Sequence, residues 1–433
     1  MDMKKFLFLV ITAFILTACV RTGPENTEYS EYEAQIVENL LYDFDYLIVF
    51  IEENSPLIGP IERRFNIDFS EEISRIRSRI TLGNINFGRA TTFEEMERVA
   101  AQFFYDEILM DITMTTRGLG HLAPTSEESL IDHFARVQRY LLEEERSSLG
   151  YLFYEMYRDP VLSRFYNLDD ICLETDGLGE FDKNNITTTI LVEDEVAYVA
   201  VASFMNSIEL DGEVLRPFFE EIQDFDHLII DIRGNLGGYM SHFTYLFMAT
   251  LSDDVQVVNY PEFFRRTEPI MEHVEAYIDS YRVHNGFTGT FGPAADFFQE
   301  NPMLDMNSSD RALLDYVVEW EFLIEPSEDN VPFDGEIWLL VDHWSASASE
   351  NAAIYSMSSG FATVVGYDTI GVLGAMTVSI PLPNTGILFR VDFGFIPNED
   401  GWSQEEFGVA PQYRVPFGED ILEYVLDTIM KGD

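Results

Sequence analysis

The sequence predicts an α/β protein that carries a helical unit at its N-terminal end. From about residue 32 to 114, apolar residues recur mostly at helical spacing. Between 186 and 202 the chain becomes β-rich, with two runs of Val, Ile and Thr around an acidic turn. Two short apolar strands, 227–232 and 337–342, each lead through a loop of small residues into a helix. Such strands are typical of a parallel sheet buried on both faces, which places the chain in the α/β class.

The helical unit is predicted from its apolar spacing and from two helix starts. Phe69–Glu72 and Ala90–Glu95 each place Ser or Thr shortly before acidic residues, as at a helix N-terminus. Residues 126–170 are helical in pattern again and rich in Tyr, Phe and Arg. The first helix is indicated by the spacing of Ile36, Leu40, Leu41, Phe44 and Leu47.

Further elements are expected along the second half of the chain. Helices are predicted at about 212–223 and 239–251, and strands near 362–366, 376–381 and 387–393, with a hairpin turn at 383–386. We divide the chain into a leader (1–18), a tether (19–31), a helical N-terminal unit (32–125), a helical connector (126–183) and an α/β core (184–433) with an insertion at about 254–334.

The charge balance of the chain excludes some partners. Its 433 residues carry 26 Lys and Arg against 77 Asp and Glu, a formal net charge of −51. Phosphate binding needs clustered basic side chains, so nucleic acid is excluded as a partner, and docking on anionic lipid is disfavoured. Because 46% of the residues are hydrophobic, the chain can bury a core and is not a disordered acidic tail.

The first 18 residues have the layout of a targeting segment. A short basic region with Lys4 and Lys5 precedes an apolar run that is too short to span a bilayer. Leu16–Cys19 resembles a bacterial lipobox, which implies cleavage before Cys19 and lipidation of its sulfur. An ordinary secretory signal with an incidental Cys is the alternative. We therefore expect an extracytoplasmic, lipid-anchored protein of a bacterial membrane. Because Val20 stands where an Asp often retains lipoproteins at an inner membrane, an outer membrane or the cell surface is an option.

The cysteines and histidines do not predict a disulfide or a metal site. The chain has two Cys, and if Cys19 is lipidated, Cys172 has no partner within the chain. Acidic neighbours would raise the pKa of the Cys172 thiol, so we interpret it as a buried structural residue. Paired Cys and His with zinc spacing are lacking in the sequence, and no metal or organic cofactor is implied.

Two strand–loop–helix units suggest where chemistry takes place. Each has a loop of small residues, 233–238 and 345–350, before a helix whose first N–H groups are available to an anion. A Ser at such a turn is exposed and suited to nucleophilic attack, with N–H groups aimed at a developing oxyanion. The alternative is that Ser345 or Ser347 only caps the helix.

Four segments in order resemble the tail-specific, or C-terminal-processing, serine proteases. They are Asp231–Gly238, Val341–Glu350, Gly366–Thr369 and Gly408–Pro411. The resemblance implies a crotonase-like ββα core, with the middle Ser of Ser-Ala-Ser-Ala-Ser-Glu as nucleophile. It also implies an oxyanion hole formed by an N–H of the Gly-rich loop and the N–H after the nucleophile. These roles carry over onto Ser347, onto Gly237 or its neighbour Gly238, and onto Ala348.

The general base predicted for this chain differs from that of the family branch that uses a Ser–Lys dyad. Val372 occupies the Lys position, and neither Lys183 nor Lys431 lies near it in the sequence. The chain is closer to the Ser-His-Glu branch, which resembles the tricorn core protease and the chlamydial secreted protease. On this resemblance His121 is the general base, and Glu405, or its neighbour Glu406, orients it.

The sequence as a whole therefore predicts a secreted, lipid-anchored serine endopeptidase. Its partners would be peptide or unfolded-protein substrates and the membrane that holds the lipid. A PDZ-like substrate gate is not evident between His121 and Asn184, so the 254–334 insertion is a candidate for specificity. Two rivals remain: a catalytically inactive relative that binds peptides or other ligands, and an esterase that uses the same site. The oligomeric state is not predicted.

Overall fold

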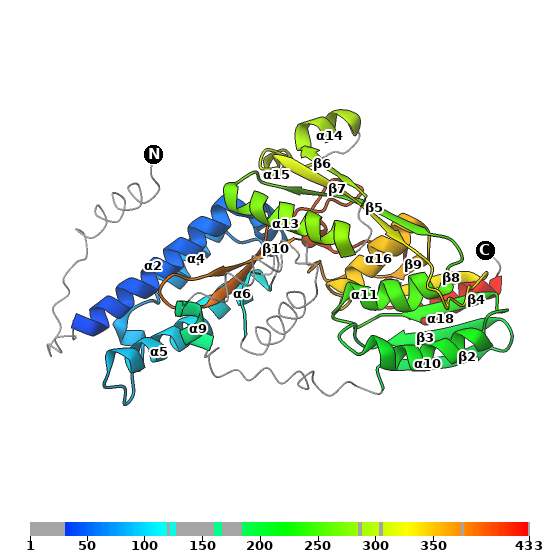
Figure 1. Cartoon of the computed structure of the whole chain (residues 1–433), viewed down its shortest axis with the longest axis horizontal. Coiled ribbons are helices and arrows are strands. Elements are labelled where there is room, and N and C mark those ends of the chain that lie inside the picture. Colours follow the sequence, from blue (N-terminus) through cyan, green and yellow to red (C-terminus); the bar gives the residue numbers. More distant parts are fainter. Residues whose placement is uncertain are drawn as a thin grey trace.

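The protein is elongated, with the helical unit at one end and the α/β core at the other (Figure 1). The computed structural model describes residues 31–118, 122–126, 160–166, 184–284, 288–302, 306–373 and 376–431, except for the side chains of 31 and 280–284. The predicted α/β class is confirmed, since the core is a six-stranded mixed sheet with helices packed against it. Within the described part of the chain, no helix is long and apolar enough to cross a membrane.

Helices begin at both of the helix starts that the sequence predicts in the N-terminal unit, one at Phe69 and one at Phe93. The Asp68 carboxylate accepts the Glu71 N–H at 2.9 Å, and Thr92 and Glu95 form a reciprocal capping box. Both arrangements satisfy N–H groups that lack a partner inside the helix. The elements are α2 (Glu31–Asn54), α3 (Ile58–Phe65), α4 (Phe69–Arg77), η2 (Leu82–Asn84), α5 (Phe93–Phe103), the π-helix η3 (Phe104–Leu109) and α6 (Met110–Thr116).

The core sheet has the strand order β12-β9-β8-β4-β3-β2. Strand β2 is antiparallel to β3, and the other neighbours are parallel. Asp231 lies opposite Leu340, and Val341 lies opposite Gly366, so the loops after three adjacent strands begin at the same edge. The strands are β2 (Ile186–Val192), β3 (Val196–Val201), β4 (His227–Asp231), β8 (Glu336–Val341), β9 (Thr363–Gly366) and β12 (Tyr413–Arg414).

The core helices match the predicted ones except at their ends. The helix expected at 212–223 begins earlier, because the Ser207 side chain caps it by accepting the Leu210 N–H at 3.2 Å. The helix expected at 239–251 is one continuous run with a π-helical middle. The helices are α10 (Ile208–Glu221), α11 (Met240–Phe243), η6 (Thr244–Met248), α12 (Ala249–Leu251), α16 (Ala348–Ser359), α17 (Gln404–Phe407) and α18 (Ile421–Lys431).

The segment expected as an insertion forms an antiparallel sheet of its own, in the order β5-β7-β6. It lies along the upper edge of the molecule in Figure 1. The carboxylate of Glu262 in β5 accepts the Trp320 indole N–H at 2.7 Å within the insertion and the Met376 N–H at 2.8 Å just before β10 (Thr377–Pro381). The Asn259 main chain in β5 bonds to the Ser358 hydroxyl of α16 at 2.7 and 2.8 Å, which ties the insertion to the core. Its elements are β5 (Gln256–Phe264), α13 (Glu268–His284), β6 (Thr290–Pro293), α14 (Ala294–Glu300), α15 (Ser308–Arg311) and β7 (Tyr316–Ile324).

Two strands that we expected within the α/β core lie instead beside the helical unit. Strands β10 (Thr377–Pro381) and β11 (Leu388–Asp392) pair with the short strand β1 (Ala123–Pro124) rather than with the core sheet. The buried carboxylate of Asp43 in α2 holds the hairpin turn by accepting both the N–H and the hydroxyl of Thr385. The described remainder of the connector is α9 (Pro160–Tyr166), whose Tyr166 hydroxyl accepts the Leu388 N–H at 3.1 Å.

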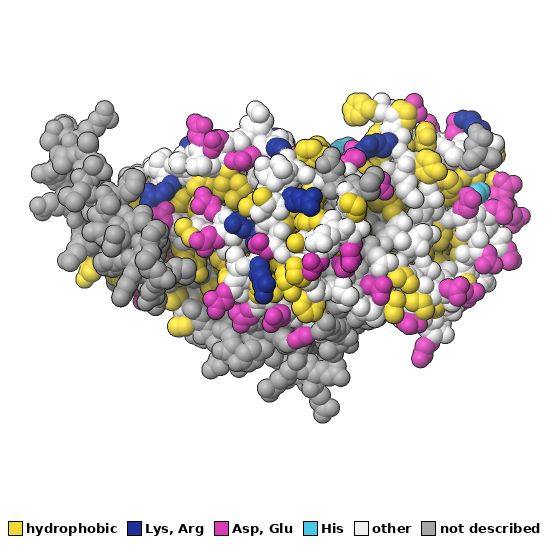
Figure 2. All heavy atoms as spheres, turned by 90° about the horizontal axis from the view of Figure 1, so that it is seen from above, with side chains coloured by type: hydrophobic (Ala, Val, Ile, Leu, Met, Phe, Trp, Pro, Cys, Tyr) yellow, Lys and Arg dark blue, Asp and Glu magenta, His cyan; other side chains and the backbone are white. Residues whose placement is uncertain are grey.

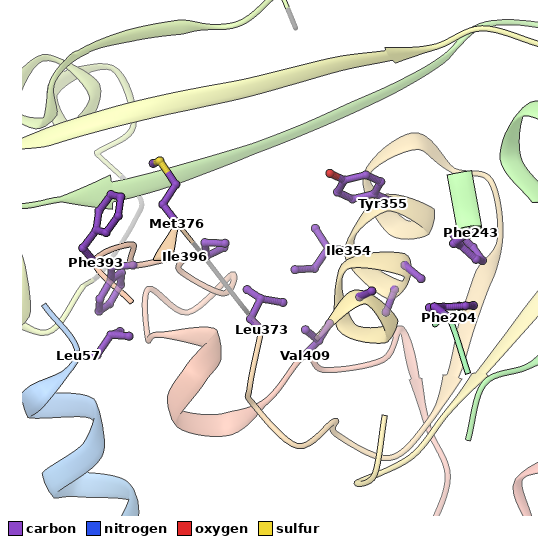
Figure 3. Packing of buried hydrophobic residues seen from close by; sticks show 14 of the residues in the cluster. Leu57, Phe204, Phe243, Ile354, Tyr355, Leu373, Met376, Phe393, Ile396 and Val409 are labelled. Carbon is purple, nitrogen blue, oxygen red and sulfur yellow. The ribbon is translucent and has the colours of Figure 1, made fainter. Parts of the chain in front are cut away.

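The helical unit and the core share one hydrophobic cluster. Leu57 beside α3, Leu373 and Val409 from loops, and Ile354 from α16 belong to it and lie in one region of Figure 3. Burial of apolar side chains stabilises this junction by about 25 cal/mol per Å². Acidic side chains are scattered along the whole face shown in Figure 2, as the net charge of −51 leads one to expect.

Candidate active site

Ser347 stands at the turn between β8 and α16, in an unusual backbone conformation. Its φ and ψ are 53° and −117°, a region that costs a non-glycine residue about 1–3 kcal/mol. The residue is half-buried at the N-terminal end of α16. Ser345, the other candidate, is fully buried, and its hydroxyl donates to the Ile232 carbonyl at 3.0 Å. Of the two serines, Ser347 is therefore the one that substrate can approach.

The carboxylate of Glu350 holds the nucleophile turn from within. It is fully buried and accepts the Ser347 N–H at 3.0 Å, the Val372 N–H and the Gly371 N–H at 2.8 Å, and the Thr369 hydroxyl at 2.5 Å. Burial raises the pKa of Glu350, while these four donors favour its charged form. Glu350 was not among the predicted site residues, although Ser347-Ala-Ser-Glu350 has the capping-box spacing that could have indicated its role.

We call residues 369–373 the linking loop, because it joins the surroundings of Ser347 to those of Glu405. The Val372 carbonyl accepts the Ser347 N–H at 2.8 Å. The N–H of the next residue, Leu373, donates to Glu405 Oε1 at 3.1 Å. Val372 therefore lies beside the nucleophile, where the Ser–Lys branch would place its Lys.

Glu405 and Glu406 have different surroundings, although both are buried in α17. The Glu406 carboxylate is bound by the Arg63 guanidinium at 2.7–3.1 Å. The Glu405 carboxylate faces the linking loop instead. Of the two acids, Glu405 is thus the one oriented toward the segment that contacts Ser347, and Glu406 is held in an ion pair.

The Gly-rich loop after β4 lies directly against the nucleophile turn. The Ala346 N–H donates to the Asn235 carbonyl at 3.1 Å, and a Cβ on Gly237 would come within 2.9 Å of Ser347 Cβ and of Ala348 N. The Gly237 N–H itself donates to Asn235 Oδ1 at 2.8 Å. Among the described residues, no acceptor is bonded to the N–H of Gly238 or of Ala348. In this conformation Gly238, the weaker of our two glycine candidates, is the one with a free donor.

A network of buried polar side chains lies next to this Gly-rich loop. The Phe204 carbonyl accepts the Tyr239 N–H at 2.9 Å, and Phe204 bridges to Gly238. Behind Phe204, the fully buried His242 ring contacts the Asp211 carboxylate at 2.7 Å, and Asn185 donates to the same carboxylate at 2.6 Å. These buried side chains therefore join the chain around the Gly-rich loop to the residue before β2 and to α10, and they make no contact with Ser347.

Two charged residues near the Gly-rich loop, Asp231 and Arg233, make structural contacts. The Asp231 carboxylate binds the Arg233 guanidinium at 2.6 Å and the Tyr198 hydroxyl at 2.7 Å. The pKa of Tyr198 is raised to about 12, by burial first and then by Asp231. His343 is an exposed turn residue whose ring centroid lies 5.4 Å from that of Trp344.

Several predicted residues cannot be placed. His121 and Cys19 lie outside the described residues, as do Lys183 and Cys172. The one Lys within them, Lys431, pairs with Asp427 in α18 at 3.1 Å. No group of three or more His, Cys, Asp or Glu among the described residues is arranged to hold a metal ion.

Comparison with known proteins gives one family match. The family model described as Peptidase family S41 matches residues 195–415, which include Ser347, Glu350 and Glu405. No protein with a curated description matches the chain. The matched segment spans the core sheet and the insertion, from β3 to β12.

Comparison with solved structures gives matches of low similarity. A peptidase candidate from Parabacteroides merdae is 14% identical with a TM-score of 0.45, over 93% of this chain and 98% of that one. Mature CPAF complexed with lactacystin is 14% identical with a TM-score of 0.45, over 92% and 100%. The photosystem II D1 C-terminal processing protease is 17% identical with a TM-score of 0.33, over 57% and 52%. At these values we base the assignment on the family match.

Proposed function

Because the chain belongs to peptidase family S41 and is a serine peptidase, we propose that it is a secreted, lipid-anchored endopeptidase that uses Ser347, His121 and Glu405. The observation that carries the proposal is the strained turn at Ser347, where the Ala348 N–H at the start of α16 has no acceptor among the described residues. This is the arrangement that a nucleophile with an adjacent oxyanion donor requires.

In the proposed mechanism, Ser347 Oγ attacks the carbonyl carbon of the scissile peptide bond, and His121 takes the hydroxyl proton. The tetrahedral oxyanion accepts hydrogen bonds from Ala348 N–H and from the Gly237–Gly238 loop, each worth about 3 kcal/mol in the transition state. His121 then gives its proton to the leaving amine, and the C–N bond breaks. Water, deprotonated by His121, hydrolyses the resulting ester and regenerates Ser347.

Glu405 orients His121 in this proposal and stabilises the imidazolium that forms. Two contacts support Glu405 rather than Glu406: Glu405 accepts the Leu373 N–H of the linking loop, and Arg63 engages Glu406. Buried carboxylates of this kind fix the tautomer of a catalytic imidazole without taking its proton. We therefore expect Glu405→Gln, and not Glu406→Gln, to lower kcat for the folded protein.

The test compares the full-length protein with Ser347→Ala, His121→Ala and Glu405→Gln on unfolded casein and on short esters. We expect Ser347→Ala and His121→Ala to lose at least about 10³-fold in kcat, because triad members act as a unit. Equal residual activity in all four proteins would remove the proposal. Hydrolysis of esters but not of casein would favour an esterase. Neither activity, together with peptide binding, would favour an inactive relative.

Lipid anchoring is proposed from the leader and the lipobox-like Leu16–Cys19. A lipidated cysteine would attach the peptidase to a bacterial membrane on the extracytoplasmic side. In cells, Cys19→Ser is expected to release the protein from the membrane fraction, since the protein-bound lipid would be lost. Continued membrane association of the variant would contradict the anchor.

A further inference from the structure

Two consecutive arginines at the end of α3 contact the segments that carry the proposed catalytic residues. Arg63 binds side chains: the Glu406 carboxylate at 2.7 Å and the Asp310 carboxylate at 2.6 Å. Arg64 binds main chain instead. Its Nη1 donates to the Glu405 carbonyl at 2.6 Å and to the Gly371 carbonyl at 3.3 Å, and its Nη2 donates to the Ile370 carbonyl.

The contacts of Arg64 add a main-chain connection between two segments that the hydrogen bond from the Leu373 N–H to the Glu405 side chain already joins. Ile370 and Gly371 belong to the linking loop, and Glu405 belongs to α17. A guanidinium is planar and offers five donors in a fixed fork, so three carbonyls around it are held at defined positions. Gly371, at φ +76°, lacks the Cβ that would overlap Arg64 Nη1, which allows this close approach.

The main chain of the linking loop is hydrogen-bonded to both Glu350 and Arg64. Glu350 accepts the N–H groups of Gly371 and Val372, while Arg64 donates to the carbonyls of Ile370 and Gly371. Glu350 also accepts the Ser347 N–H, and Arg64 also holds Glu405. A continuous chain of hydrogen bonds therefore runs from the nucleophile through the loop to the proposed acid, and it ends in the helical unit.

We propose that Arg64 is a positioning residue for the peptidase reaction. Through the main chain of Glu405 and of the linking loop, it fixes where Glu405 lies relative to Ser347. The inference rests on the proposed function. It makes the helical N-terminal unit a necessary part of the active site, because α3 supplies the guanidinium. Arg64 is half-buried, and burial lowers its pKa, but an arginine stays charged at any physiological pH.

Arg64→Lys and Arg64→Met are the variants that test this role. Lys has three donors on a compact ammonium and cannot span three carbonyls as a planar fork does. Since a misplacement of about 1 Å can cost about 100-fold in rate, we expect kcat to fall about 10- to 100-fold in both variants. KM should change by less than about twofold, because the contacts of Arg64 are with main-chain carbonyls and its proposed role is to orient Glu405 rather than to bind substrate. In Arg64→Ala, added guanidinium at millimolar concentration should restore part of kcat.

Arg77→Met is the matched control, since Arg77 lies in the same helical unit but makes an exposed ion pair with Asp45. All rates are divided by the folded fraction measured by circular dichroism at the assay temperature. An Arg64→Met protein with wild-type kcat per folded molecule, or with a raised KM and unchanged kcat, would overturn the inference while the peptidase stands. A wild-type protein without hydrolytic activity would remove the proposed function and this inference with it.

Discussion

Replacing Glu350 tests whether its carboxylate holds the nucleophile turn and the linking loop together. Each of its two oxygens accepts two hydrogen bonds: Oε1 from Thr369 and Gly371, and Oε2 from Ser347 and Val372. Glutamine keeps the shape of the side chain but has one acceptor oxygen and one NH₂ group. Alanine removes both acceptors and leaves a cavity.

The cost of each change follows from the donors that lose their acceptor. In Glu350→Gln, an amide oxygen at the Oε2 position keeps Ser347 and Val372, and the NH₂ can donate to the Thr369 hydroxyl. The Gly371 N–H and the Thr369 O–H then lose their acceptor, which costs about 2–6 kcal/mol at about 1–3 kcal/mol for each donor. In Glu350→Ala the Val372 N–H loses its acceptor as well, so three donors cost about 3–9 kcal/mol. The Ser347 N–H keeps the Val372 carbonyl.

The assay is urea denaturation, followed by tryptophan fluorescence and, in parallel, by residual peptidase activity. We expect the order of stability to be wild type, Glu350→Gln, Glu350→Ala, with activity lost at lower urea than fluorescence in both variants. Glu399→Gln, at an exposed acid, is the matched control. A Glu350→Ala protein as stable as wild type, or a Gln variant as unstable as the Ala variant, would refute the reasoning.

Three further outcomes are expected. Burial raises the pKa of Glu262 from 4.5 to about 7, so the folded state keeps a proton that the unfolded chain has lost. The free energy of unfolding should therefore fall by about 3 kcal/mol as pH rises from about 4.5 to about 7. Urea midpoints at both ends should show a smaller fall for Glu262→Gln, and an equal fall would exclude Glu262 as its source. Gly237→Ala puts a Cβ 2.6 Å from the Ala346 carbonyl oxygen, so kcat should drop with the displaced loop, and an unchanged kcat would contradict that packing. Arg63→Met leaves two buried carboxylates without a cation and should cost about 3–5 kcal/mol of stability by urea denaturation, whereas a loss below about 1 kcal/mol would show that the ion pairs are dispensable.

Local features of the chain could be predicted because they depend on neighbours in sequence. The capped starts of α4 and α5, the strands β4 and β8, and the turn that carries Ser347 all follow from periodicity and caps within a few residues. The predicted ends of α10, at about 212 and 223, were less accurate. The helix begins at Ile208, directly after its Ser207 cap, and not where the apolar spacing alone placed its start. The strands β10 and β11 were recognised, but their partner β1 was not, because pairing depends on long-range packing.

The sequence by itself therefore determined the α/β class and the order of the main elements, and through the family resemblance it predicted Ser347 as the nucleophile. Only the tertiary structure decided that Glu350 joins four donors, that Arg63 takes Glu406 and leaves Glu405 on the linking loop, and that Asn235 occupies the Gly237 N–H. It also brought Arg64 to Glu405, 341 residues away. The physical reason is range: helical and strand periods act over a few residues, whereas these hydrogen bonds exist only once the helical unit has packed against the core.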